Sequence, residues 1–382
     1  MSTTASSAWG NLADRFEKSQ TRKILSLDGG GIRGIITLEI LAKLESDLKK
    51  RLQRGDDFRL SDFFDYFGGT STGAIIAAGL SIGMSVDELL EFYTKRGKEM
   101  FDKSSLLKKW KSLYESGPLL NMLQTTFGKD TNLDIANGKF RSLLTVVTMN
   151  RSTDSPWPIS NNPLARYNDK TRPDNNQNIK LYQLIRASTA APAYFPPETL
   201  EWDKNDPSKT FVFVDGGVTP YNNPAFLLYR MATHPAYKLN WKKGEDELLM
   251  VSVGTGSAAS GGEYRNLGNT LMELPTNLMY AIQIDQDINC RAFGRCTYGP
   301  EIDRELGDMI PTEKDTNRDF LYVRYNADLS EQGLKDLGLG HLDPEKVQKM
   351  DSVKYMEDLQ SVGTKTAMAQ VNLAHLGSFV KG

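Results

Sequence analysis

Three glycine-rich motifs, each directly after a short apolar run, constrain this chain more than any other feature. They are DGGGIRG at 28–34, GTSTG at 69–73 and DGG at 215–217. Apolar runs that break into glycines are typical of buried strands that feed tight loops at a sheet edge. In sheets of parallel strands, ligand chemistry belongs at the carboxyl ends. The motifs therefore predict three loops at one edge, where Ser71 and Asp215 are expected to meet.

Strand-like and helix-like segments alternate along the sequence. Leucines recur every three or four residues from Leu38 to Leu52, which predicts a helix of about five turns. AIIAAGL after the GTSTG motif predicts a small, buried helix, and Ser85 with Glu88 forms a capping box before another. Short, apolar, β-branched runs predict strands at 23–27, 142–149, 211–215 and 248–256. This alternation predicts an α/β fold, with a central, mostly parallel sheet covered by helices on both faces.

The composition narrows the class of protein. Of 382 residues, 39% are hydrophobic and 25% are charged, and the net charge is −2. These values are ordinary for a globular protein with a core, and they give no reason to expect a nucleic-acid polymer as a partner. Cys290 and Cys296 cannot form a disulfide framework, so reduced thiols and a cytoplasmic location are expected. With neither a secretory signal pattern nor an apolar run near the ~20 residues that cross a bilayer, the chain would act on a lipid peripherally.

Residues 1–21 are expected to form an N-terminal arm. Trp9, Leu12 and Phe16 follow helical spacing, which predicts a short amphipathic helix packed on the protein body, with lipid contact as the alternative. The stretch 101–114 mixes lysines with Leu106, Leu107, Trp110 and Leu113. It is interpreted either as a helix that rests on anionic headgroups or as a plain surface helix.

Ser71 is the candidate nucleophile. In a G-x-S-x-G motif, Gly69 and Gly73 permit a sharp strand-to-helix turn that presents the serine oxygen. The helix that follows adds partial positive charge where an oxyanion develops. The alternative is a serine that merely caps a buried helix.

The glycine loop after the first strand allows two interpretations. Its consecutive N–H groups could hold an oxyanion, and the candidate residues for this hole are Gly29, Gly30, Gly31, Arg33 and Gly34. The loop also fits a dinucleotide fingerprint, which requires a second strand with an acidic end roughly 20 residues later. Here that span is the leucine-striped helix, so the nucleotide interpretation is weaker. Arg33 would direct positive charge at an ester oxygen or a lipid phosphate, or would be an ordinary exposed or salt-bridged arginine.

Asp215 is the candidate general base for the Ser71 hydroxyl, with Gly216 and Gly217 leaving room around it. A free aspartate has a pKa near ~3.9, so the carboxylate would need a desolvated pocket to act near neutral pH. The alternative is a turn aspartate. Among the histidines, only His341 follows in the Ser–Asp–His order of a hydrolase triad, and it also fits a surface loop.

With these residues in place, the chain resembles the patatin-like phospholipases. The motifs at 28–34, 69–73 and 215–217 match that family's oxyanion, nucleophile and DGG motifs, and RASTAAPAYFPP (186–197) and DGGVTPYNNPA (215–225) match in kind. The resemblance implies a three-layer patatin-like fold, a Ser71–Asp215 dyad without histidine, and no metal or cofactor. It also implies hydrolysis of fatty-acyl esters of membrane phospholipids through an acyl-serine intermediate.

The resemblance covers residues 22–256, which are expected to form the catalytic domain, with 257–382 as a mainly helical region packed on it. Bacterial relatives of this size include anti-phage effectors that a cyclic oligonucleotide switches on. Such a regulatory ligand would be sought after residue 257, where Arg291 and Arg295 would meet phosphates or else be solvated. The oligomeric state stays open, with a homodimer as one alternative.

Two other functions are retained as alternatives. One is a soluble esterase with a triad that uses His341. The other is a storage or binding patatin with a vestigial site.

Overall fold

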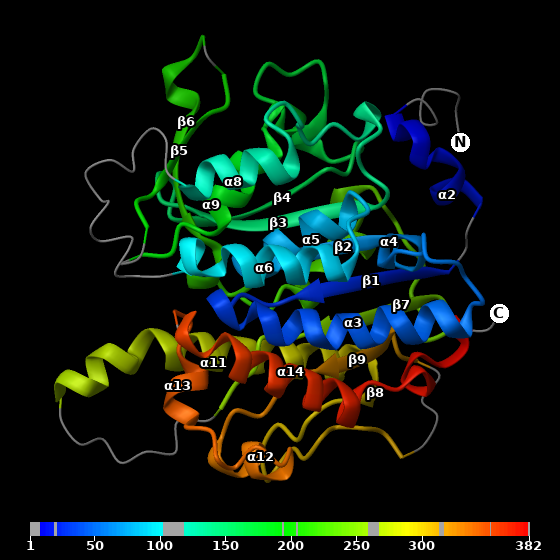
Figure 1. The fold of residues 1–382 in the computed structure, drawn as a ribbon. Helices are drawn as coiled ribbons and strands as arrows, with labels where there is room; N and C mark the ends of the chain where they lie inside the picture. Colours follow the sequence, from blue (N-terminus) through cyan, green and yellow to red (C-terminus); the bar gives the residue numbers. More distant parts are fainter. Residues whose placement is uncertain are drawn as a thin grey trace.

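The computed structural model describes residues 8–18, 21–101, 118–192, 195–203, 205–258, 267–312, 317–351 and 353–380. A sheet lies at its centre, and the described strands follow the order β5-β6-β3-β2-β1-β7-β9-β8, with β4 paired to β3 (Figure 1). The strands are β1 (Arg22–Leu27), β2 (Tyr66–Thr70), β3 (Leu143–Asn150), β4 (Ser155–Ser160), β5 (Glu198–Glu201), β6 (Thr210–Asp215), β7 (Leu248–Val253), β8 (Arg295–Tyr298) and β9 (Leu321–Tyr325). The described α-helices are α2 (Ala13–Lys18), α3 (Gly34–Arg51), α4 (Leu60–Phe63), α5 (Thr72–Ser81), α6 (Val86–Phe101), α8 (Pro118–Phe127), α9 (Leu181–Ser188), α10 (Ala225–Thr233), α11 (Leu267–Phe293), α12 (Glu331–Asp336), α13 (Pro344–Gln348) and α14 (Met356–Gln370).

The middle of the sheet is parallel and one side of it is antiparallel. β3, β2, β1, β7, β9 and β8 pair in parallel, whereas β4 and β6 run antiparallel to β3, and β5 to β6. Although β6 runs the opposite way, its last residue, Asp215, pairs with Thr148 near the carboxyl end of β3. Asp215 therefore still reaches the edge at which β1 and β2 end.

Helices cover both faces of the sheet, as two adjacent glycines of β2 make plain. A Cβ on Gly68 would meet Leu228 of α10, and one on Gly69 would meet the backbone of Gly73 in α5. Because successive strand residues face opposite sides, α10 and α5 lie on opposite faces. The predicted α/β fold with a mostly parallel sheet between helices is confirmed.

The leucine-striped segment forms α3 as predicted, and its leucines Leu38, Leu41, Leu44 and Leu48 are fully buried. The C-terminal helix α14 lies alongside α3 (Figure 1). Gly363 lets the two helices approach closely, because a Cβ there would lie 2.7 Å from the Cβ of Glu39. Thr364 Oγ1 also donates to a Glu39 carboxylate oxygen at 3.1 Å. Residues distant in sequence thus form one layer.

The region 257–382, expected to be mainly helical, also contains two strands that the sequence did not predict. β8 and β9 extend the same sheet beside β7. β8 has only four residues and includes arginine and threonine, so its sequence lacks the apolar run that marks a buried strand. The residues expected to pack on the catalytic domain therefore also contribute to its central sheet.

The N-terminal arm packs on the body, as expected. Trp9, Leu12 and Phe16 are buried, and Arg15 forms an ion pair with Asp65 at 2.9 Å. The stretch 101–114, considered for membrane contact, lies outside the described residues except for its first residue. None of the described helices is both long and apolar enough to span a membrane. Cys290 and Cys296 are buried free thiols.

Candidate active site

Ser71 occupies a strained turn between β2 and α5. Its φ is 54° and its ψ is −121°, a backbone conformation that costs a non-glycine residue about 1–3 kcal/mol. The turn is tight enough that a Cβ on Gly73 would lie 2.3 Å from the carbonyl oxygen of Leu27. Gly69 and Gly73 therefore allow the backbone to approach closely enough to present the serine, as the motif predicts.

A side chain from another motif holds the backbone of Ser71. The Ser71 N–H donates to Ser188 Oγ at 2.9 Å, and Ser188 Oγ–H donates to the carbonyl of Val147 at 2.7 Å. Ser188 is buried at the end of α9. Sequence reasoning noted the stretch 186–197 only as a matching segment and assigned Ser188 no part, although its place in that motif was a usable signal.

Asp215 lies in direct contact with the serine. Ser71 Oγ donates to Asp215 Oδ2 at 2.6 Å, so the expected meeting of the two side chains is confirmed. The N–H of Gly217 donates to the other carboxylate oxygen at 2.7 Å. Burial raises the pKa of Asp215 to about 6, and the hydrogen bonds from Ser71 and Gly217 oppose the rise. A buried carboxylate with this pKa can accept a proton from the serine near neutral pH.

The histidines take no part in this contact. His341 is exposed in the turn between α12 and α13, and His234 accepts the N–H of Ala236 at 3.2 Å. His375 stacks on Tyr298 with ring centroids 4.4 Å apart. Among the described residues, no hydrogen bond links a histidine to Ser71 or Asp215. The direct serine–aspartate bond leaves no gap for the imidazole that the triad alternative requires.

The glycine loop after β1 has fewer free donors than the motif suggests. The N–H of Gly29 donates to the Asn222 carbonyl at 3.0 Å, and that of Gly34 donates within the turn to Gly31 and Ile32. The N–H of Arg33 donates to Gly30 at 3.3 Å. Among the described residues, no acceptor meets the N–H groups of Gly30 and Gly31. The candidate donors for an oxyanion are therefore reduced from five residues to Gly30 and Gly31.

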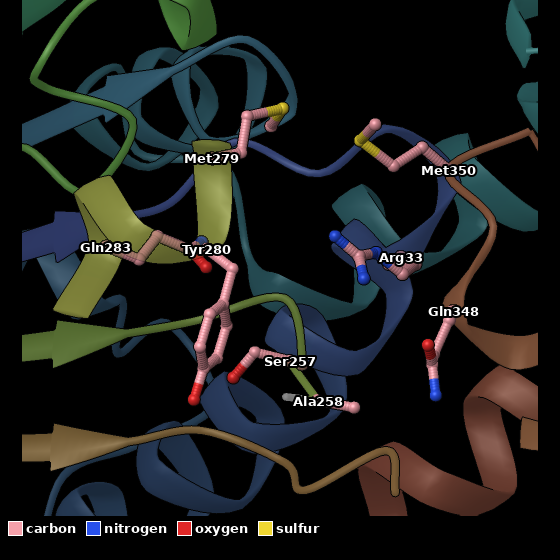
Figure 2. Close-up of a pocket in the computed structure, with 9 residues that line it drawn as sticks. Arg33, Ser257, Ala258, Met279, Tyr280, Gln283, Gln348 and Met350 are labelled. Carbon is pink, nitrogen blue, oxygen red and sulfur yellow. The ribbon is translucent and has the colours of Figure 1, made fainter. Parts of the chain in front are cut away.

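Arg33 is neither exposed nor salt-bridged, so both ordinary interpretations of it are wrong. It is 7% exposed, and its Nε donates to the carbonyl of Gly30 at 3.4 Å. No carboxylate of the described residues forms an ion pair with it. Burial lowers its pKa to about 10, and the charge of Asp28 opposes the change. Figure 2 shows its guanidinium pointing into a cavity between Tyr280 of α11 and Gln348.

Asp28, the first residue of the glycine motif, is hydrogen-bonded to side chains that lie more than 250 residues later in the sequence. Arg324 of β9 donates two hydrogen bonds to the carboxylate of Asp28, at 3.0 and 2.6 Å, and Gln283 of α11 donates a third at 3.0 Å. All three side chains are buried. Sequence reasoning missed Arg324 and Gln283. Nothing in the sequence around either residue marks it as the partner of a motif more than 250 positions away.

The two arginines expected to meet phosphates are already engaged. Arg291 is fully buried and forms a two-bond ion pair with Asp287, at 2.9 and 2.7 Å. Arg295 belongs to β8 and lies 3.5 Å from a carboxylate oxygen of Glu245. Arg291 is therefore also not a solvated helix arginine. Arg291 is therefore not available to a phosphate, and a regulatory phosphate site elsewhere in this region stays a prediction.

Comparison with known proteins agrees with this arrangement. The family model described as patatin-like phospholipase matches residues 25–229, which include all three glycine motifs. The chain belongs to the patatin-like phospholipase family. This patatin-like chain is 32% identical over 256 residues to Patatin-17 of Solanum cardiophyllum, a match covering 62% of the chain and 61% of that relative. It is 30% identical over 250 residues to Patatin group J-1 of Solanum tuberosum, covering 61% and 60%.

The patatin-like chain thus spans about three fifths of the length of these curated relatives. Among solved structures, it is similar to human GIVD cytosolic phospholipase A2, with a TM-score of 0.47 and 12% sequence identity. That match covers 94% of this chain and 60% of the human one.

Proposed function

We propose that this patatin-like chain is a lipid acyl hydrolase that cleaves fatty-acyl esters of membrane phospholipids through an acyl-serine intermediate. The observation that carries the proposal is the 2.6 Å hydrogen bond from Ser71 Oγ to Asp215 Oδ2, made at a strained turn beside the glycine loop. Membership of the family supports the same reaction class. The enzyme would work from the cytoplasm, peripherally at the bilayer surface.

In the proposed reaction, Ser71 Oγ attacks the ester carbonyl carbon while its proton passes to Asp215 Oδ2. The C–O bond to the glycerol unit then breaks, and Asp215 returns the proton to the leaving oxygen. Water attacks the acyl-serine, gives a proton to Asp215 and releases the fatty acid as Ser71 is re-protonated. The dyad thus ends each cycle in its starting state.

The glycine loop would stabilise the charge that develops on the carbonyl oxygen. The N–H groups of Gly30 and Gly31 are the available donors, and one such donor is worth about 3 kcal/mol of barrier. Arg33 carries a buried positive charge next to the same loop. Its guanidinium lines a cavity, where it would hold the lipid phosphate.

The test is product analysis by lipid mass spectrometry, comparing wild type with Ser71→Ala. We expect lysophospholipid and fatty acid from the wild type and a loss of at least a thousandfold in the variant. A fluorophosphonate probe should label wild type at Ser71. Lysophospholipid release that survives the alanine substitution would overturn the assigned nucleophile. A wild type that neither reacts with the probe nor cleaves lipid would favour the storage or binding alternative.

Activation by a cyclic oligonucleotide, a role in anti-phage defence and a homodimeric state stay predictions. The same lipid assay, repeated with and without cyclic di- and trinucleotides, tests the first of them. A rise in lipid cleavage on addition of one such nucleotide is the expected result, and equal rates would remove the prediction.

A further inference from the structure

Two adjoining cavities lie beyond the glycine loop, away from Ser71. The first contains Arg33 and is the one shown in Figure 2. The second has a volume of about 230 Å³ and is bordered by Glu301 and Asp328. The two share lining residues, namely Ser257, Ala258, Tyr280 and Gln283. The two cavities therefore adjoin each other, and Tyr280 and Gln283 of α11 line both.

The uncompensated charges that line the two cavities are of opposite sign at the two ends. Arg33 at one end is buried and has no carboxylate partner among the described residues. Glu301 and Asp328 at the other end are exposed, and no described cation pairs with either. Among the described residues, the only hydrogen bond to the Asp328 side chain is the one that Ser330 N–H donates to Oδ1 at 2.8 Å. By contrast, the remaining lining charges, Asp287 and Arg324, are neutralised within the protein. A ligand that reaches from the first cavity into the second would therefore contact the Arg33 guanidinium at one end and the carboxylates of Glu301 and Asp328 at the other.

The order of the strands sets the order of these groups along the sheet edge. Ser71 follows β2, the glycine loop follows β1, Ser257 lies beyond β7 and Asp328 lies beyond β9. Neighbouring strands are about 4.8 Å apart. The reacting oxygen, the buried guanidinium and the free carboxylates are therefore spread over about three strand spacings. A glycerophospholipid with a choline or ethanolamine headgroup carries its ester, its phosphate and its terminal ammonium group in this same order.

Tyr280 adds a surface suited to an organic cation. It borders both cavities, and it is close enough to Asp328 for that carboxylate to help raise its pKa, although burial is the larger cause. An aromatic ring beside carboxylates is a recurring way to bind quaternary ammonium groups.

We propose that the second cavity binds the ammonium end of a zwitterionic phospholipid headgroup, so that the enzyme selects phosphatidylcholine and phosphatidylethanolamine over anionic lipids. Glu301, Asp328 and the ring of Tyr280 receive the ammonium group, while Arg33 receives the phosphate. This selectivity rests on the proposed hydrolase function, which it deepens by naming the substrate headgroup.

The first experiment compares hydrolysis of phosphatidylcholine and phosphatidylglycerol in matched mixed micelles. The double variant Glu301→Gln/Asp328→Asn should lower the choline-to-glycerol ratio of kcat/KM about tenfold. Its rate on p-nitrophenyl butyrate, which has no headgroup, should stay at the wild-type value. Glu305→Gln is the matched control, because it removes an exposed charge nearby that does not border the cavity. A ratio that stays constant while the ester rate is normal would overturn the proposal.

The second experiment measures binding without turnover. The Ser71→Ala protein is titrated with glycerophosphocholine and with glycerol 3-phosphate, followed by calorimetry. Glycerophosphocholine should bind about three- to tenfold more tightly, and the carboxylate substitutions should remove that difference. Equal affinities for the two ligands contradict the ammonium site even if the hydrolase function holds. If the wild type cleaves no phospholipid but glycerophosphocholine still binds more tightly than glycerol 3-phosphate, the hydrolase function alone is contradicted.

Discussion

Ser71 and Asp215 each occupy a place that costs folding free energy. Ser71 has a positive φ, and Asp215 is a buried carboxylate without a cationic partner among the described residues. In the proposed reaction both features raise reactivity, because the strained turn presents the hydroxyl and desolvation makes the carboxylate a stronger base. At the scale of single residues, the strain at Ser71 and the burial of Asp215 lower the folding stability, and the proposed reaction uses both.

The raised pKa of Asp215 predicts the pH dependence of hydrolysis. Only the ionised carboxylate can accept the Ser71 proton, so activity should be low below the pKa of about 6 and rise through it. The measurement is kcat/KM on a soluble ester between pH 4.5 and 8, where one ionisation with a midpoint near that value is expected. A midpoint near ~4, the value of a solvated aspartate, would contradict the desolvated base.

Ser188 should act as a positioning residue through the backbone of Ser71. Ser188→Ala removes the acceptor of the Ser71 N–H, and we expect kcat to fall about fivefold with KM little changed, since one hydrogen bond is worth roughly 1 kcal/mol. The measurement is steady-state kinetics together with the rate of fluorophosphonate labelling.

Ser26→Ala is the matched control for this substitution. Ser26 is fully buried in β1, and its hydroxyl has no hydrogen-bond partner among the described residues. Its loss should leave kcat unchanged. Equal effects from the two variants would show that Ser188 serves packing alone.

At the scale of elements, the sequence predicted those features that depend on local chemistry. Gly73 marks its turn because only glycine tolerates the approach of Leu27, and the stripe of α3 marks a buried face. The antiparallel direction of β6 was not predictable, because strand direction depends on a long-range partner, here Thr148. Ser188 was missed for a related reason: the motif at 186–197 marks its position, but its contact with the Ser71 N–H is long-range and is not readable from its neighbours in sequence.

The ion pair between Asp28 and Arg324 should be a major structural link between β1 and β9. Arg324→Met would leave a buried carboxylate without its cation, and we expect a loss of about 3–5 kcal/mol in the free energy of unfolding. Urea denaturation measures it. Lys335→Met breaks an exposed pair with Glu331 and should cost less than about 1 kcal/mol. Similar losses in both variants would contradict the importance assigned to the buried pair.

At the scale of the whole molecule, the sequence suggested a separation that the packing does not favour. Residues 22–256 were expected to form the catalytic domain, yet β9 pairs with β7, α14 covers α3, and Arg324 contacts Asp28. The sequence could not reveal this, because β8 and β9 are short and stand among helical segments. We propose that the two expected regions form one cooperative folding unit.

Truncation of the chain tests whether the two regions fold as one cooperative unit. A chain ending at residue 258 would expose the edge of β7 and leave Asp28 without Arg324, so we expect it to be aggregated or unfolded. Circular dichroism and size-exclusion chromatography provide the measurement, with the full chain as control. A soluble truncated protein with a cooperative thermal transition would contradict the single unit.

The distance in sequence between Asp28 and Arg324 also bears on biosynthesis. A ribosome releases Asp28 first, and the Arg324 guanidinium that neutralises it emerges only 296 residues later. Until then the loop beside the reactive serine lacks its anchor. Nascent chains from which Arg324 has not yet emerged should therefore be inert toward the membranes of the cell that makes them.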